Sequence, residues 1–186
     1  MSAPISIDNR TGLIVTARQV LSPHFDERPP AVQPDLLVIH GISLPPGEFA
    51  GSWIEAFFCG NLPAGAHPYF AEIAHLRVSS HLLIRRPGTL VQFVPLGSRA
   101  WHAGASSFGG RSGCNDFSIG VELEGTDDLP YDPRQYATLS ALTTALCNAY
   151  PAISDDRIVG HADIAPGRKT DPGSAFDWLR YRNALR

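Results

Sequence analysis

The sequence of 186 residues lacks a long apolar run and has few cysteines. No segment approaches the roughly 18 apolar residues that a membrane-spanning helix needs. Residues 1–20 lack the basic start and unbroken apolar stretch of a secretory signal. The three cysteines, Cys59, Cys114 and Cys147, contain no CxxC pair and do not make a disulfide framework. Because free thiols suit a reducing compartment, we expect a cytoplasmic protein with no membrane partner.

Charge is also sparse. Charged residues make up 18 % of the chain, and the net charge is −3 at a sequence pI near 6.1. This balance argues against a nucleic acid as the main partner. The length and the 44 % hydrophobic content fit one domain, residues 1–186, with a single buried core. Nothing in the sequence demands more than a monomer. The 16 prolines and 17 glycines indicate long, shaped loops, where sites are usually built.

The apolar and alternating patterns predict a mixed α/β fold. Strands are expected at 36–40, 79–86, 89–94, 117–123 and 157–161. Helices are expected at about 48–58, after the N-cap Asp132, and at 175–181. The helix after Asp132 carries an apolar stripe of Tyr136, Leu139, Leu142, Leu146 and Tyr150. Because strands and helices interleave, we expect a central mixed β-sheet flanked by helices.

The strand at 117–123 carries a candidate catalytic acid. One side of the alternation holds Phe117, Ile119, Val121 and Leu123; the other holds Ser118, Gly120, Glu122 and Glu124. The small neighbours would leave open space beside Glu122, and partial burial would raise its pKa toward the range of a general base or acid. The alternative is a solvated charge on the outer face of the sheet.

Two histidines at strand ends and an aspartate form a candidate metal site. His161 is expected to end a strand, Asp171 lies ten positions later in a loop, and His40 ends another strand. Histidine and carboxylate are ligands that a catalytic zinc takes, with one position left open for water. The spacing is not a compact metal motif, so His161 and Asp171 can also be read as capping residues.

Other polar residues near these segments are open to two interpretations. Lys169 could stabilise an oxyanion formed from an amide carbonyl, or it could be a solvated loop charge. His102 beside Trp101 could line a sugar pocket or serve a structural role. His24, His67 and His75 are expected at the surface or in loops, and His81 could support the site from behind. The cysteines are expected to be small buried hydrophobes.

Six segments occur in a characteristic order: LLVIHGISLPPG (36–47), HPYF (67–70), SHLLIRRPG (79–88), RAWHAG (99–104), CNDFSIGVELEGTD (114–127) and GHADIAPGRKTDPGSAFDW (160–178). This ordered set resembles the AmpD family of cytoplasmic 1,6-anhydro-N-acetylmuramyl-L-alanine amidases. The resemblance runs from about residue 12 to the end without large insertions. It implies the mixed-sheet fold that these amidases share with peptidoglycan-recognition proteins and phage amidases.

The resemblance implies a role for each candidate residue. The zinc ligands of the family fall on His40, His161 and Asp171, which together would hold one Zn²⁺. The catalytic carboxylate falls on Glu122 and the oxyanion-stabilising lysine on Lys169. A tyrosine bordering the site falls on Tyr69, and Trp101 and His102 are candidates for substrate contacts. The implied substrate is a small anhydro-muropeptide, cut between the muramic acid and L-alanine.

Two positions depart from the family, and two other functions stay open. Gly41 stands where an asparagine often follows the first ligand, and Gly113 where a larger or basic residue is common. Both departures could alter substrate affinity. The alternatives are an amidase acting on polymeric peptidoglycan and a muropeptide-binding module without catalysis, although such modules typically lose a zinc ligand.

Overall fold

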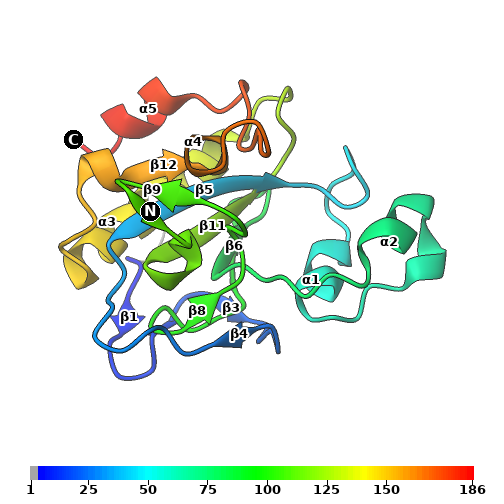
Figure 1. Ribbon diagram of the computed structural model, residues 1–186. Coiled ribbons are helices and arrows are strands. Elements are labelled where there is room, and N and C mark those ends of the chain that lie inside the picture. The colour runs from blue at the N-terminus through cyan, green and yellow to red at the C-terminus, as the bar shows by residue number, and fades with distance from the viewer. Residues whose placement is uncertain (1–3) are drawn as a thin grey trace.

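A six-stranded mixed sheet forms the centre of the computed structural model, which describes residues 4–186 (Figure 1). Its order is β12 (Ile158–Gly160), β5 (Leu36–Ile42), β11 (Ser118–Glu124), β6 (Leu82–Ile84), β7 (Leu90–Gln92) and β3 (Arg18–Gln19). The first four strands run parallel, β7 runs antiparallel to β6, and β3 runs parallel to β7. With helices packed around it, this sheet confirms the predicted fold class.

Short strand pairs and helices surround the sheet. The pairs are β1 (Ile7–Asp8) with β2 (Leu13–Ile14), β4 (Phe25–Asp26) with β8 (Arg99–Ala100), and β9 (Ser107–Phe108) with β10 (Arg111–Ser112). The α-helices are α1 (Trp53–Phe58), α2 (Pro68–Ile73), α3 (Pro133–Ala149), α4 (His161–Ile164) and α5 (Trp178–Asn183). Short 3₁₀ turns lie at Ala64–Ala66, Cys114–Asp116 and Asp155–Arg157. Across residues 4–186, none of the helices has the length and apolar content to cross a bilayer.

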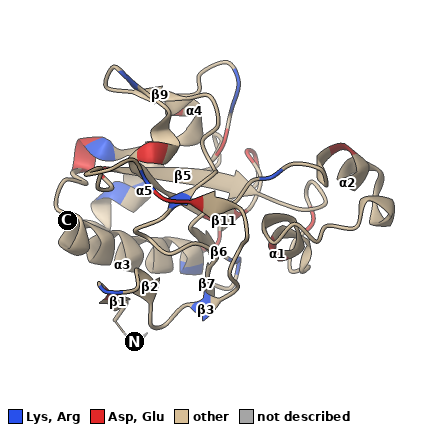
Figure 2. Cartoon of the chain, turned by 60° about the horizontal axis from the view of Figure 1, so that its bottom comes forward, with Lys and Arg blue, Asp and Glu red and all other residues tan. Residues whose placement is uncertain are grey.

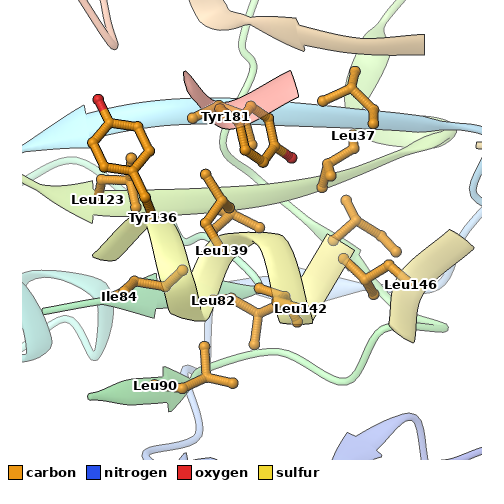
Figure 3. Close-up of a cluster of buried hydrophobic side chains, with 14 of the residues drawn as sticks. Leu37, Leu82, Ile84, Leu90, Leu123, Tyr136, Leu139, Leu142, Leu146 and Tyr181 are labelled. Atoms are coloured by element: carbon orange, nitrogen blue, oxygen red, sulfur yellow. The ribbon is translucent and has the colours of Figure 1, made fainter. Parts of the chain in front are cut away.

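The long helix α3 packs on one face of the sheet. Leu139, Leu142 and Leu146 point from the helix toward the strands, where Leu37 and Leu82 meet them (Figure 3). The same cluster includes Ile119, Val121 and Leu123 from β11, so alternate residues of the central strands serve this core. The predicted apolar stripe of the helix is confirmed. Because α3 covers this face of the sheet, the alternate side chains of the central strands project from the opposite face.

The start of α3 is closed by a capping box. The Asp132 carboxylate accepts a hydrogen bond from the Arg134 backbone N–H at 2.8 Å, and the Gln135 side chain accepts one from the Asp132 N–H at 3.0 Å. Hydrogen bonds from the Arg134 side chain and backbone lower the pKa of Asp132. The predicted N-cap is therefore confirmed, and its carboxylate stays ionised in acid.

Replacing Asp132 with alanine should lower the melting temperature by about 2–4 °C at neutral pH, because the first turn of α3 loses an acceptor. The pKa of Asp132 is depressed on folding, so its charge stabilises the fold above the unfolded pKa near 4 and loses this effect as the pH falls. The difference in melting temperature between the alanine variant and the parent should therefore shrink below about pH 4. Circular dichroism melts at several pH values measure it. The Asp132→Asn variant retains the cap and serves as the control; a loss equal to that of alanine would contradict the cap assignment.

The lobe formed by α1 and α2 projects beyond the sheet on the side opposite α5 (Figure 1). Its apolar residues form a second cluster, in which Ile54, Phe58 and Phe70 pack with Val91 and Phe93. The sheet thus shares one core with α3 and another with this lobe. Acidic and basic positions are interspersed over the chain in the view of Figure 2.

Several predicted boundaries were wrong. The first helix begins at Trp53 rather than near residue 48, after a loop that turns at Ala50 and Gly47 with positive φ angles. The hairpin strands, Leu82–Ile84 and Leu90–Gln92, are shorter than the predicted 79–86 and 89–94. Before β6, the Ser79 N–H donates to the carbonyl of Trp101 rather than to the neighbouring hairpin strand. The terminal helix spans Trp178–Asn183 rather than 175–181, because Asp177 caps it. The single domain over 1–186 stays a prediction, and residues 1–3 lie outside the described part.

Candidate active site

Backbone pairing brings the candidate residues together on the sheet face opposite α3. His40 of β5 and Glu122 of β11 are register partners in the parallel ladder, so their side chains leave the sheet side by side. Gly160 of β12 pairs with Ile39, which places the next residue, His161, beside His40. His161 was expected to end a strand, but it begins α4 instead. The chain turns after Gly160 because the Asp163 carboxylate accepts a hydrogen bond from the Gly160 N–H at 2.7 Å.

Three ligand atoms converge at this point. The Nδ1 atoms of His40 and His161 lie 2.9 Å apart, and each is 3.1 Å from Oδ2 of Asp171. The two histidines are buried and the aspartate is half-buried. Among residues 4–186, these three form the one cluster of histidine, cysteine and acidic groups able to hold a metal ion. The predicted metal site is therefore assembled in space.

The chemistry of these atoms fits a cation. Nε2 of His161 lies 3.2 Å from the carbonyl oxygen of Ala103, which can only accept. A nitrogen of Arg168 is farther from Nε2, at 3.4 Å, and donates to that carbonyl at 2.6 Å, so Nε2 carries the proton and Nδ1 presents a lone pair. Three acceptor atoms within 2.9–3.1 Å of one another repel unless a positive charge lies between them. The corresponding edge of a tetrahedral zinc site with bonds of about 2.0–2.1 Å is about 3.3 Å. The residues present thus fit zinc.

The protonation states also suit metal binding. Burial lowers the pKa of His40 to about 4, although the negative charge of Asp171 opposes this shift. Burial alone would raise the pKa of Asp171, but contacts with His161 and His40 outweigh it and hold that pKa well below its usual range. At neutral pH the site therefore offers a neutral imidazole and a carboxylate, which are the forms that bind metal.

Glu122 stands beside the cluster in a different environment. Burial raises its pKa well above the usual value, the charge of Asp171 raises it further, and Lys169 lowers it. Glu124, on the same face, is tied to Arg85 and to the backbone N–H groups of Ala50 and Arg86. Within residues 4–186 no hydrogen bond constrains the Glu122 carboxylate, which borders the cleft. The alternative of a solvated outer charge is wrong, because Glu122 is only 7 % exposed.

A cleft of about 530 Å³ opens over these residues. The lobe and the loops after β5 and β11 supply its walls, and its lining includes His40, Glu122, His161, Asp171, Lys169, Tyr69, Trp101, His102, Phe57, Val78, Thr126 and Asp127. Lys169 is exposed on the rim. Every residue predicted for the site therefore borders one cleft, although the predicted role of each residue stays a prediction.

Contacts with other side chains of the protein hold Trp101 and His102 in place. The Trp101 indole N–H donates to Asp26 at 3.1 Å, and its ring stacks near His24 with centroids 6.1 Å apart. Nδ1 of His102 lies 2.9 Å from Nε2 of His40, and its Nε2 lies 3.1 Å from the Ser118 hydroxyl. Both ring nitrogens of His102 are thus engaged within the protein. Its predicted contact with substrate stays a prediction.

The other histidines differ from one another in burial. His24 lies in the loop before β4, as expected, and is buried there with Nδ1 3.2 Å from the carbonyl oxygen of Val78. His67 caps α2 through the Tyr69 N–H. His81 is fully buried, and its Nδ1 accepts a hydrogen bond from the Gly120 N–H at 3.0 Å. This contact places His81 under the strand that carries Glu122.

The departures at Gly41 and Gly113 have separate structural reasons. A Cβ at Gly41 would collide with the Tyr131 hydroxyl, which donates to the carbonyl of Pro172 at 2.9 Å. Gly113 has a φ of +70°, which disfavours other residues, and a Cβ there would make only an ordinary contact with the Asp116 carboxylate at 3.7 Å. Tyr131 thus fills the space next to the first ligand and contacts the residue after Asp171.

Sequence reasoning missed several residues that support the site. Asn115 holds the backbone of the turn after Trp101, and Ser118 supports His102. Arg168 donates to the carbonyls of Ala103 and Ala105. Asn115 and Ser118 lie in the segment 114–127, which already stood out. Their contacts with residues 102 and 103, like those of Arg168 with residues 103 and 105, join distant segments and leave no local signal.

Comparisons with known proteins agree with this geometry. A profile of the N-acetylmuramoyl-L-alanine amidase family matches residues 30–174. The 1,6-anhydro-N-acetylmuramyl-L-alanine amidase AmpD of Salmonella typhimurium (strain SL1344) is 61 % identical over 171 residues, which cover 92 % of this chain and 91 % of the relative. A crystal structure of a selenomethionine derivative of AmpD matches with a TM-score of 0.94 at 58 % identity, over 98 % of this chain and 100 % of that one.

A more distant structure holds a ligand. The amidase AmiD from E. coli, in complex with the substrate anhydro-N-acetylmuramic acid-L-Ala-D-gamma-Glu-L-Lys, matches with a TM-score of 0.60 at 28 % identity. The match covers 87 % of this chain and 65 % of that one. The fold around the cleft is therefore shared with a protein that was crystallised with a muropeptide.

Proposed function

Because the chain belongs to the AmpD family of N-acetylmuramoyl-L-alanine amidases, we propose that it hydrolyses the amide between 1,6-anhydro-N-acetylmuramic acid and L-alanine in small muropeptides. In this proposal His40, His161 and Asp171 hold one zinc ion, Glu122 moves the proton, and Lys169 stabilises the oxyanion. The reaction would serve the recycling of cell-wall fragments.

One observation carries the proposal. Three metal-ligating atoms meet within 3.1 Å of one another, and the register partner of one ligand is a buried carboxylate facing the same cleft. A zinc ion with three protein ligands and an open position lowers the pKa of water to about 7 and polarises a carbonyl. A module that only bound muropeptides would not need a carboxylate kept free of hydrogen bonds beside that ion.

Glu122 supplies the base and then the acid. Its raised pKa suits accepting a proton from the attacking water and releasing it to the alanine nitrogen as the amide bond breaks. The nitrogen needs this proton because an amine anion is a poor leaving group. Glu122 leaves the sheet from β11, which is paired with β5 on one side and β6 on the other, so both transfers occur at one place in the cleft.

Lys169 supplies a positive charge on the rim of the cleft. It acts on both Glu122 and His40 through space, lowering the pKa of each. An ammonium group there can stabilise the negative oxygen that forms when water adds to the amide carbonyl. Tyr69 and Trp101 border the same space and would contact the sugar or the peptide.

Replacing Lys169 with alanine should lower kcat by about 10²–10³-fold with a smaller change in KM, since the lysine acts chiefly on the charge that develops during reaction. Steady-state kinetics on the purified, zinc-loaded variant measure this. The Lys169→Arg variant retains a cation and should recover part of the loss. A change confined to KM would assign Lys169 to substrate binding instead.

We further propose that the enzyme works in the cytoplasm as a monomer. Cys59, Cys114 and Cys147 are free thiols, which suits a reducing compartment. Sedimentation of the purified protein would test the oligomeric state.

The test is to incubate the zinc-loaded protein with 1,6-anhydro-N-acetylmuramyl tripeptide and follow the products by mass spectrometry. We expect free tripeptide and anhydro-sugar, loss of both with a chelator, and recovery on adding zinc. Intact substrate with zinc-loaded protein would refute the assignment. Parallel incubation with polymeric peptidoglycan distinguishes an enzyme that prefers intact wall, and binding that is indifferent to metal would indicate a module without catalysis.

A further inference from the structure

A second layer of groups lies behind the two histidine ligands. Nε2 of His40, on the side of the ring away from the ligand cluster, lies 2.9 Å from Nδ1 of His102. The two rings meet edge to face, with an interplanar angle of 90°. Nε2 of His161 lies 3.2 Å from the carbonyl oxygen of Ala103, the next residue in the chain. One turn therefore contacts both histidines.

The hydrogen bonds behind His40 fix the tautomers of its ring and of His102. The Ser118 hydroxyl lies 2.6 Å from the Cys114 carbonyl, which can only accept, so the serine donates there. Ser118 Oγ must then accept from Nε2 of His102 at 3.1 Å, and Nδ1 of His102 is left without a proton. That bare nitrogen accepts from Nε2 of His40, so Nδ1 of His40 presents its lone pair to the ligand cluster.

The turn itself is held in place by an asparagine. Oδ1 of Asn115 accepts from the backbone N–H groups of His102 at 3.1 Å and of Ala103 at 2.8 Å. Arg168 donates to the Ala103 carbonyl at 2.6 Å and leaves a second lone pair of that oxygen for His161. The positions of both acceptors are thus determined by side chains outside the metal site.

The strand below leaves room for the His102 ring only because residue 120 is glycine. A Cβ on Gly120 would lie 2.6 Å from Cγ and Nδ1 of His102. The same strand carries Ser118 on one side of this glycine and Glu122 on the other. The open space expected beside Glu122 is therefore occupied in part by the His102 imidazole.

From this geometry we propose that His102 is a positioning residue for the metal site. Its neutral imidazole orients His40, and the turn pinned by Asn115 orients His161 through the Ala103 carbonyl. The inference rests on the proposed zinc site. It assigns to residues 101–104 (WHAG) and 114–116 (CND) a role other than substrate contact. Outer hydrogen bonds of this kind fix the ring orientation and tautomer of a ligand, and their loss typically weakens metal binding by about 10–100-fold.

The test compares two replacements of nearly the same shape. His102→Leu removes the acceptor for His40, whereas His102→Asn keeps an oxygen close to the place of Nδ1. Zinc affinity is measured by competition with a chromophoric chelator, and the melting temperature of each metal-free protein is measured alongside. We expect the leucine variant to bind zinc about 10–100-fold more weakly. The asparagine variant should recover much of the difference at a similar metal-free melting temperature.

A spectroscopic measurement tests the same chain without any substitution. With ¹⁵N-labelled imidazoles in zinc-loaded protein, two-bond nitrogen–proton correlations should report the Nε2–H tautomer for His40 and for His102. A third variant, Gly120→Ala, should displace the His102 ring and weaken zinc binding while leaving every ligand and acceptor in the sequence. Equal zinc affinity for the leucine variant and the parent, or an Nδ1–H tautomer for His102, would overturn the proposal.

The outcomes also separate this inference from the proposed function. If the parent protein binds no zinc in the competition assay, the zinc site itself fails. If the parent binds zinc and cleaves muropeptide while all three variants bind zinc as tightly as the parent, only the positioning role of His102 fails. Tight zinc binding that weakens in the leucine variant and returns with asparagine supports both.

Discussion

Replacement of Glu122 with glutamine should lower kcat by about 10²–10⁴-fold while zinc remains bound. The carboxylate is 7 % exposed and does not belong to the ligand cluster, so the substitution removes proton transfer without removing a ligand. Glutamine has nearly the same shape as glutamate but cannot accept and release a proton. The loss should therefore come from chemistry rather than from folding.

The measurement combines release of tripeptide from anhydro-muropeptide with zinc content by mass spectrometry on the same samples. Glu72→Gln, on the exposed face of α2, makes the same chemical change away from the cleft and should retain full activity. Unchanged turnover in Glu122→Gln would remove this residue from the mechanism. Loss of zinc together with activity would show that Glu122 instead supports the metal.

Replacement of Asp171 with alanine should reduce activity to the background level and lower zinc affinity sharply. Asp171 supplies the single negative charge among the three ligand atoms, and its low pKa keeps that charge at working pH. Two neutral imidazoles are a poor site for a catalytic zinc, which usually has three protein ligands. Unlike the Glu122 variant, this one should lose metal and turnover together.

Competition with a chelator and turnover at saturating zinc measure the two effects. Asp128→Ala removes an exposed carboxylate from the loop after β11 and serves as the matched control. If high zinc concentrations restored full turnover, Asp171 would contribute to affinity only. Zinc affinity equal to that of the parent would mean that the metal lies elsewhere.

Much of the fold followed from local patterns because those patterns match the packing. The run 36–40 is buried on both faces and lies in β5, and the alternation after residue 117 lies in β11. The stripe of α3 faces the core, and its capping box is present. The two histidine ligands were identifiable because they lie near the ends of strands, and neighbouring parallel strands bring such positions to one edge of the sheet. Asp171 was identifiable only as a carboxylate in the loop ten positions after His161.

The parts that sequence reasoning missed depend on contacts between distant segments. His161 begins α4 because the Asp163 carboxylate closes the turn through the Gly160 N–H. In the sequence, this aspartate looks like any polar residue of a loop. Phe117 packs with Leu36 and Val38 rather than with Ile119, because β11 begins one residue later. The orientation of His102 depends on Ser118 and Cys114, which pattern reasoning had no means to connect with it.

The position of Lys169 makes the site accessible to selective labelling. It is the only lysine in the sequence, and it is exposed on the rim of the cleft. Reductive methylation with ¹³C-formaldehyde keeps the positive charge of an amine, and in this protein it would mark one side chain and the amino terminus. The resulting pair of methyl signals would give a resonance probe within the cleft, sensitive to metal loading and to muropeptide, without introducing a reporter by mutation.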